Sequence, residues 1–325
     1  MDRENANGGE AQIDRNLAME AVRVTEAAAI AANRLMGGGD EKAADQAAFK
    51  AMFKALQNID MAGTVSIGEN EGNGGTKLLP GDSVGTGEGV NVEVAMVPLE
   101  GKSILARGGP NALSLLAMAE AGGFLKFPEI YFEKIAVGAG HPKSIVDLDY
   151  STETNLKNLA ESNGCCVNEL VVCLLDRPRN AELITNIREV GARIRLILDG
   201  DVSGIIQVAK PDSGVDIYMG IGGAQEGVLA AAALRGMGGQ MQGRLVVRNA
   251  EEESKAIELG FNDLNRKFVC EEMAYGNITF AATGVTYGPL LEGVHISNEL
   301  AITHSLVVRS QTKTLRYIKG YHPLK

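Results

Sequence analysis

One stretch constrains the fold more than any other, residues 92–103, which read VEVAMVPLEGKS. Its first part, Val92 to Met96, combines β-branched residues with partial alternation, which is typical of a β-strand. We expect this strand to break at Pro98 and to deliver Glu100 into a glycine-containing turn. A rigid strand end that presents a carboxylate beside a tight turn is a common way to build a metal-dependent site. The sequence therefore predicts a functional site at the end of this strand.

Composition excludes several classes of protein. A net charge of −10 argues against a nucleic-acid partner, because phosphate backbones require a cationic face. No apolar run approaches the roughly 18 residues that a membrane span needs. Residues 1–13 are polar, which predicts a disordered tail and no signal peptide. The four cysteines lack a metal-type CxxC spacing, so we expect reduced thiols and a cytoplasmic location.

The central stretch also carries a family resemblance. Residues 97–102, VPLEGK, resemble the signature Asp-Pro-(Ile/Leu)-(Asp/Glu)-Gly-Thr of the lithium-sensitive, magnesium-dependent sugar phosphatases. With the rest of the chain, from about residue 14 to 320, the sequence is similar to class II fructose-1,6-bisphosphatases of the bacterial and cyanobacterial type. The resemblance implies an α/β fold, the layered αβαβα sandwich of the inositol monophosphatase-like type. It also implies a role in carbohydrate metabolism, such as gluconeogenesis or the Calvin cycle.

Helical spacing of apolar residues predicts two helices near the N-terminus, from Asp14 to about Met36 and from about Lys42 to Asn58. The segment from Arg23 to Asp45 is similar to the opening of the class II bisphosphatases. That resemblance implies that Asp45 is a metal ligand facing the site from its helix. Taken by itself, Asp45 would read as a solvated charge.

Three further acids complete the ligand set that the resemblance implies. Residues 68–71, GENE, match the family's acidic loop, with Glu69 as a ligand and Glu71 as a second acid. Residues 220–228, GIGGAQEGV, resemble the segment whose glutamate, here Glu226, completes the metal cluster. We thus expect Asp45, Glu69, Glu100 and Glu226 to be what remains of a site for Mg²⁺ or Mn²⁺. Glu69 and Glu100, together with Lys102, stand at the catalytic position.

Substrate-binding residues are implied in the second half of the chain. Arg177 and Arg179 match family positions that bind phosphate, and a guanidinium fork suits phosphate oxygens. Tyr131 matches a substrate-contacting tyrosine, although a tyrosine on a strand is more often a packed core residue. Asp199 and Asp201 match acids that hydrogen-bond sugar hydroxyls.

Alternating strand and helix patterns after residue 165 predict an α/β second half with its site at strand ends. We place a boundary near residue 160, which divides a metal-site half, residues 14–160, from a sugar-phosphate half, residues 161–325. Between them, small and apolar residues from Pro110 to about Ala121 predict a helix.

The signature departs from the family at two places that matter for activity. Val97 stands where the family has Asp, and Lys102 stands where it has Thr. Glu41 also replaces a basic residue of the family pattern. We therefore expect a protein that binds a sugar (bis)phosphate and whose metal-dependent phosphate-ester hydrolysis is lost or strongly reduced.

Two alternatives remain open from the sequence. One is an active or repurposed sugar-phosphate enzyme, acting on fructose-1,6- or sedoheptulose-1,7-bisphosphate or working as a metal-free lyase. The other is a regulatory or structural partner of an active paralogue. A homo-oligomer is expected by family analogy.

Overall fold

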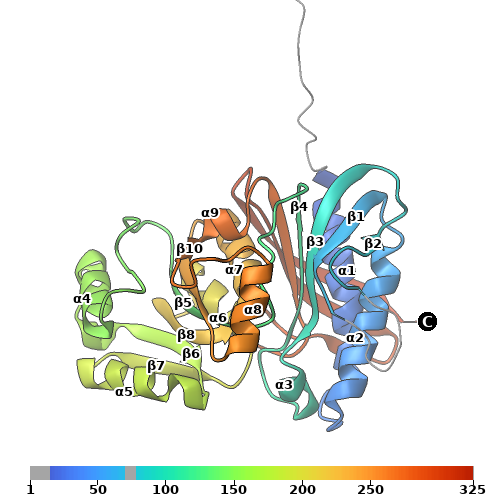
Figure 1. Cartoon of the computed structure of the whole chain (residues 1–325). Coiled ribbons are helices and arrows are strands. Elements are labelled where there is room, and N and C mark those ends of the chain that lie inside the picture. Colours follow the sequence, from blue (N-terminus) through green and yellow to red (C-terminus); the bar gives the residue numbers. More distant parts are fainter. Residues whose placement is uncertain (1–14, 70–77, 325) are drawn as a thin grey trace, which may run out of the picture.

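The computed structural model describes residues 15–69 and 78–324. Five layers follow one another: a helical layer, a sheet, a central helical layer, a second sheet and an outer helical layer (Figure 1). The predicted layered α/β sandwich is confirmed. The predictions for residues 1–13, for Asp14 as a helix cap and for Glu71 lie outside the described residues. In the described part of the chain, every helix is too short or too polar to cross a bilayer.

The first sheet has the strand order β12-β13-β11-β4-β3-β1-β2, and β14 pairs with β13. Its strands are β1 (Met61–Ile67), β2 (Ser83–Val84), β3 (Val90–Glu100), β4 (Leu113–Ala119), β11 (Ile278–Gly284), β12 (His295–Ser297), β13 (Leu300–Arg309) and β14 (Thr314–Pro323). The sheet thus joins the early strands of the chain to its last ones.

The second sheet has the order β10-β9-β5-β8-β6-β7. Its strands are β5 (Tyr131–Val137), β6 (Val171–Leu175), β7 (Arg193–Ile197), β8 (Ile217–Gly223), β9 (Gln240–Val246) and β10 (Phe268–Val269). Strands β6, β7 and β8 run parallel, in line with the alternating strand and helix pattern. The division of the chain near residue 160 stays a prediction, because sheets are layers and do not define independently folding units.

Helices cover both outer faces and fill the middle. The two predicted N-terminal helices are confirmed as α1 and α2, which pack on the first sheet, while α4 and α5 cover the far side of the second sheet. The helices are α1 (Arg15–Asn33), α2 (Glu41–Leu56), α3 (Lys102–Ala106), α4 (Thr152–Asn163), α5 (Ala181–Val190), α6 (Asp201–Ile206), α7 (Ala224–Met237), α8 (Ala250–Glu258) and α9 (Cys270–Met273). Three 3₁₀ turns accompany them at residues 167–169, 178–180 and 207–209.

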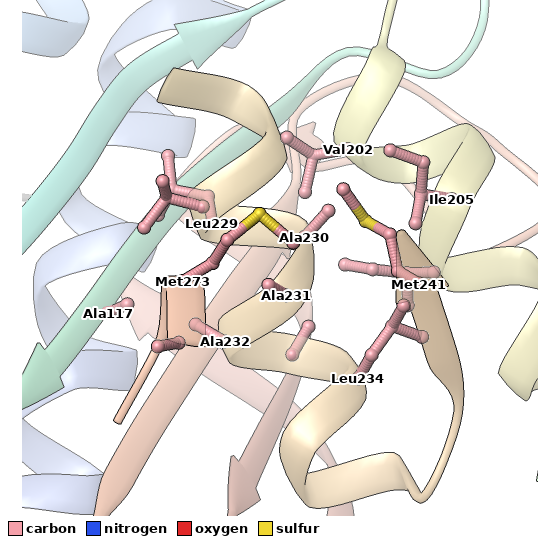
Figure 2. Close-up of a cluster of buried hydrophobic side chains, with 14 of the residues drawn as sticks. Ala117, Val202, Ile205, Leu229, Ala230, Ala231, Ala232, Leu234, Met241 and Met273 are labelled. Carbon is pink, nitrogen blue, oxygen red and sulfur yellow. The ribbon is translucent and has the colours of Figure 1, made fainter. Parts of the chain in front are cut away.

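Helix α7 is the centre of the main core. Figure 2 shows its apolar residues, among them Leu229, Ala231 and Leu234, lying between Ala117 of β4 and Ile205 of α6. The run of four alanines in this helix is buried, and small side chains let both sheets approach the helix closely. This packing brings the end of β3 and the start of α7 to the same region of the molecule.

Strand β3 is longer than the sequence indicated. It does not break at Pro98 but continues to Glu100, and its register with β4 shifts between Val97 and Glu100. A proline has no backbone N–H to donate to a ladder, and a bulge is a place in a strand where no such bond is needed. The irregularity therefore accommodates the proline within the strand.

The helix predicted from Pro110 to Ala121 is wrong, since this segment forms strand β4. All seven residues of β4 are buried, and β4 pairs with β3 on one side and β11 on the other. A strand that is covered on both faces has a continuous run of apolar residues. A short run of this kind also occurs in buried helices, so the pattern alone does not distinguish the two. The ladder on both sides overrides the helical propensity of its leucines and alanines.

Candidate functional site

A cavity of about 950 Å³ lies where β1, β3, β6 and β8 end and where β5, α3, α6 and α7 begin. It brings together nearly all the site residues that the sequence predicted. Those that line it are Glu69, Glu100, Lys102, Tyr131, Arg177, Arg179, Asp199, Asp201 and Glu226. Asp45 is not part of the lining, but it contacts the cavity through Lys102.

The turn after β3 sets the geometry of one end of the cavity. Gly101 has φ +84, a conformation that residues with a Cβ rarely adopt, and it begins the short helix α3. This turn places Glu100 at the end of the strand and Lys102 in the first position of the helix. Val97, three residues before Glu100, is buried and also lines the cavity, so a hydrocarbon surface stands where the signature has a carboxylate.

The ammonium of Lys102 lies between two of the acids implied as metal ligands. Its Nζ is 3.0 Å from Asp45 Oδ1 and 3.0 Å from Glu69 Oε2. Burial opposes the charged form of Lys102, but the neighbouring carboxylates of Glu69 and Asp45 outweigh it and raise its pKa. Burial also raises the pKa of Glu69, against the lowering effect of Lys102. The lysine thus holds the place of a cation between these two acids.

Glu100 is buried with only one of its oxygens engaged. Its Oε1 accepts a hydrogen bond of 2.7 Å from the backbone N–H of Val202, at the start of α6. Its Oε2 is buried and has no hydrogen-bond partner within the described residues. Burial raises the pKa of Glu100 well above its ordinary value, and the nearby carboxylates of Asp201 and Asp199 add to the effect. An unpartnered buried oxygen of this kind has the capacity to bind a cation or a proton donor.

Glu226 lies in the first turn of α7, against the end of β8. A Cβ added to Gly223 would lie 1.8 Å from Glu226 Oε2, so the carboxylate occupies space that only a glycine leaves. Burial raises the pKa of Glu226, and Lys134 on the neighbouring strand works in the opposite direction. Glycine in this turn therefore lets the acid fold back over the backbone into the cavity.

A divalent cation would meet a changed set of groups here. Val97 offers no ligand atom, and the ammonium of Lys102 offsets part of the charge of Asp45 and Glu69. Over residues 15–69 and 78–324, no group of three or more His, Cys, Asp or Glu side chains is arranged to hold a metal ion. Glu100 and Glu226 keep the capacity to be ligands, and a Mg²⁺ ion held by one or two carboxylates takes its other oxygens from water and substrate phosphate.

The opposite end of the cavity is cationic. Arg179 donates through Nε to the carbonyl of Ile221, over 2.9 Å, and its guanidinium carbon lies 4.4 Å from the centre of the Tyr131 ring. Arg177 donates to the carbonyl of Asp176 over 3.2 Å. Neither arginine is bound to a carboxylate in these contacts, so their positive charge is available to an anionic ligand.

The two aspartates near α6 differ in what they can offer a ligand. Asp199 accepts from Ser103 Oγ at 3.3 Å and from its neighbour's backbone N–H. Asp201 is buried, and its two oxygens accept from the ammonium of Lys134 and the hydroxyl of Tyr218. Of the two, Asp199 is therefore the one with more open hydrogen-bonding capacity.

Sequence reasoning missed Arg248, which lines the cavity, and Lys134, which binds a residue that lines it. Lys134 lies in the middle of β5, fully buried, and pairs with Asp201. Arg248 follows β9 and lines the cavity beside Tyr131. A single lysine in a strand or arginine in a loop carries no pattern, so only the folded arrangement reveals these two. Glu41, noted for its changed charge, also lines the cavity.

The comparisons with known proteins agree with this architecture. The family model "Bacterial fructose-1,6-bisphosphatase, glpX-encoded" matches residues 15–322. The chain belongs to the class II fructose-1,6-bisphosphatase family.

Two curated relatives have nearly the same length. The fructose-1,6-bisphosphatase class 2 of Haemophilus influenzae is 40% identical over 326 residues, which cover 96% of this chain and 97% of the relative. The fructose-1,6-bisphosphatase 1 class 2 of Escherichia coli K12 is 39% identical over 328 residues, covering 95% and 96%. The resemblance noted in the sequence is confirmed across the whole described fold.

Proposed function

We propose that this member of the class II fructose-1,6-bisphosphatase family binds a sugar (bis)phosphate in the cavity but has lost most or all metal-dependent hydrolysis. The observation that carries the proposal is the position of Lys102, 3.0 Å from both Asp45 Oδ1 and Glu69 Oε2. An ammonium there offsets the carboxylate charge that would attract a divalent cation. At short range and an effective dielectric near 20, its repulsion of such a cation amounts to a few kcal/mol.

Several features support sugar-phosphate binding. Arg177 and Arg179 provide guanidinium groups at one end of the cavity, and Tyr131 provides a ring surface between them and the sugar. Asp199 provides an acceptor for a hydroxyl group. The cavity volume, about 950 Å³, is at the upper end of the range found for small-molecule sites. In this proposal the protein acts in the cytoplasm as a homo-oligomer or beside an active paralogue.

The proposal is tested by measuring phosphate release from fructose 1,6-bisphosphate with Mg²⁺ and with Mn²⁺. The unmodified protein should release little or no phosphate, and the same preparation should bind the sugar bisphosphate in calorimetry. Preparations from a host lacking its own bisphosphatases remove the contaminating activity. Robust, metal-dependent turnover by the unmodified protein would show that it is an active enzyme and that the substitutions at Val97 and Lys102 do not matter as argued.

A further inference from the structure

Arg248 lies at the cationic end of the cavity, and neither the sequence patterns nor the proposed function assigns it a role. It follows β9, in the connection to α8, and it lines the same cavity as Arg177 and Arg179. Its side chain is about half exposed, with a relative accessibility of 53%. It is therefore placed to meet a ligand that enters the cavity.

The orientation of Arg248 is fixed by Glu252, one turn further along the chain. Nε of Arg248 lies 3.0 Å from Glu252 Oε1, Nη2 contacts the same oxygen, and the backbone N–H of Arg248 donates to Oε2 over 2.9 Å. Glu252 is itself held in the first turn of α8, where its N–H donates to Asn249 Oδ1. Glu252 takes the Nε and Nη2 edge, so the other N–H groups are those that can meet Tyr131 or a ligand.

The ring of Tyr131 connects Arg248 to Arg179. The guanidinium carbons of both arginines lie 4.4 Å from the centre of this ring. Cation–π contact of this kind orients a guanidinium and restricts its motion. Each of the two arginines thus has its Nε bonded to the protein and its plane set against one shared aromatic ring.

We propose that Arg248 is a phosphate-binding residue that, together with Arg177 and Arg179, makes this end of the cavity a subsite for a dianionic phosphate ester. The inference rests on the proposed sugar-phosphate binding and deepens it. Three anchored guanidinium groups suit a phosphate with several oxygens, since each can donate through the N–H groups that its anchoring contacts leave open. The subsite takes one phosphate group of the ligand, and Glu226 lies near it, since its Oε2 occupies the space beside Gly223, the strand partner of Tyr131.

The test is calorimetry with fructose 1,6-bisphosphate and fructose 6-phosphate in the presence of EDTA, so that metal binding plays no part. Arg248→Gln should weaken both ligands about 10- to 100-fold, the scale of a charge-assisted contact. The matched control is Arg244→Gln on strand β9, where the arginine pairs with Glu133 and Asp149 away from the cavity. That control should bind within about twofold of the unmodified protein, because Arg244 does not line the cavity.

A second readout separates a direct contact from a structural effect. A phosphate monoester becomes a dianion with a pKa near 6. The unmodified protein should bind fructose 6-phosphate more tightly at pH 7.5 than at pH 5.5, and Arg248→Gln should reduce this difference. Arg248→Lys keeps a charge beside Glu252 and should retain part of the affinity. It serves as the test variant if Arg248→Gln does not fold.

Each outcome decides something different. If Arg248→Gln binds both ligands as tightly as the unmodified protein, the inference is overturned and sugar-phosphate binding stands. If Arg248→Gln does not fold, the same result for Arg248→Lys has the same meaning. If the unmodified protein binds neither ligand, the proposed function and this inference fail together. A loss of affinity equal at pH 5.5 and pH 7.5 would also overturn recognition of the dianion by Arg248.

Discussion

At one end of the cavity a lysine offsets part of the charge of two acids, whereas at the other end two arginines make no ion pair with a carboxylate in their described contacts. Lys102 occupies the space between Asp45 and Glu69. Arg177 and Arg179, in contrast, are anchored by main-chain carbonyls, which fix their position without cancelling their charge. The difference supports the proposal that this protein has lost the cation chemistry of the family site and kept the part that recognises the anion.

Titration separates the two ends as well. Burial raises the pKa values of Glu69, Glu100 and Glu226 at the carboxylate end. Glu252, beside the arginine end, has a pKa lowered by its hydrogen bonds with Arg248. Acids at the first end are thus short of cationic partners, and the acid at the second end has one.

The largest expected effect is a loss of stability when Lys134 is replaced, because this lysine contacts two segments that line the cavity. Its buried ammonium pairs with Asp201 and donates to the carbonyl of Gly223 over 2.7 Å. Lys134→Met leaves the Asp201 carboxylate buried without its cation, so the free energy of unfolding should fall by about 3–5 kcal/mol in urea titrations.

A matched lysine provides the control for that prediction. Lys126 pairs with Glu93 at 3.6 Å, and its side chain is 51% exposed. Lys126→Met should cost less than about 1 kcal/mol. Equal losses in the two variants would show that the Lys134–Asp201 pair is not a support of the site.

The next effect concerns the arginine end alone. Arg179→Ala should weaken binding of fructose 1,6-bisphosphate by roughly 1.5–3 kcal/mol in calorimetry, because a charge-assisted contact is lost. Arg193→Ala is a suitable control, since Arg193 also donates to a main-chain carbonyl but does not line the cavity. An unchanged affinity in Arg179→Ala would remove the phosphate role of this residue.

The smallest effect is a pH dependence at the carboxylate end. Because burial raises the pKa of folded Glu100, the folded state binds the proton more tightly than the unfolded state. Stability from this group is present below the unfolded pKa and is lost as pH rises toward the folded pKa. In EDTA, the free energy of unfolding should therefore fall as the pH rises from 5 to 8. Glu100→Gln should make this fall smaller by roughly 1–2 kcal/mol, the scale of one buried unsatisfied group. A Glu100→Gln profile parallel to that of the unmodified protein would contradict the raised pKa.

Sequence patterns predicted the layers well and failed where burial decides the structure. Helices α1 and α2 show their periodicity in the sequence, and Asp40 caps the second through the N–H of Ala43. Strand β4 shows none, because a strand covered on both faces has no polar side to alternate with its apolar one.

For the site, the resemblance indicated which residues the fold would gather, and the contacts between them required coordinates. That Lys102 would lie near the acids was predicted from its place in the signature, but its pairing with both Asp45 and Glu69 depends on α2, β1 and α3 meeting in space. Arg248 and Lys134 belong to no motif, and long-range packing alone brings Arg248 to Tyr131 and Lys134 to Asp201.

The central claim is that Lys102 and Val97 together prevent tight binding of a divalent cation. The most direct test is calorimetric titration of Mn²⁺ into the unmodified protein, Val97→Asp, Lys102→Thr and the double variant. We expect weak binding to the unmodified protein and the tightest binding to the double variant. Each single change should do less, since Val97→Asp keeps the repelling ammonium and Lys102→Thr still lacks a ligand. Binding of Mn²⁺ to the unmodified protein as tight as to the double variant would contradict the account.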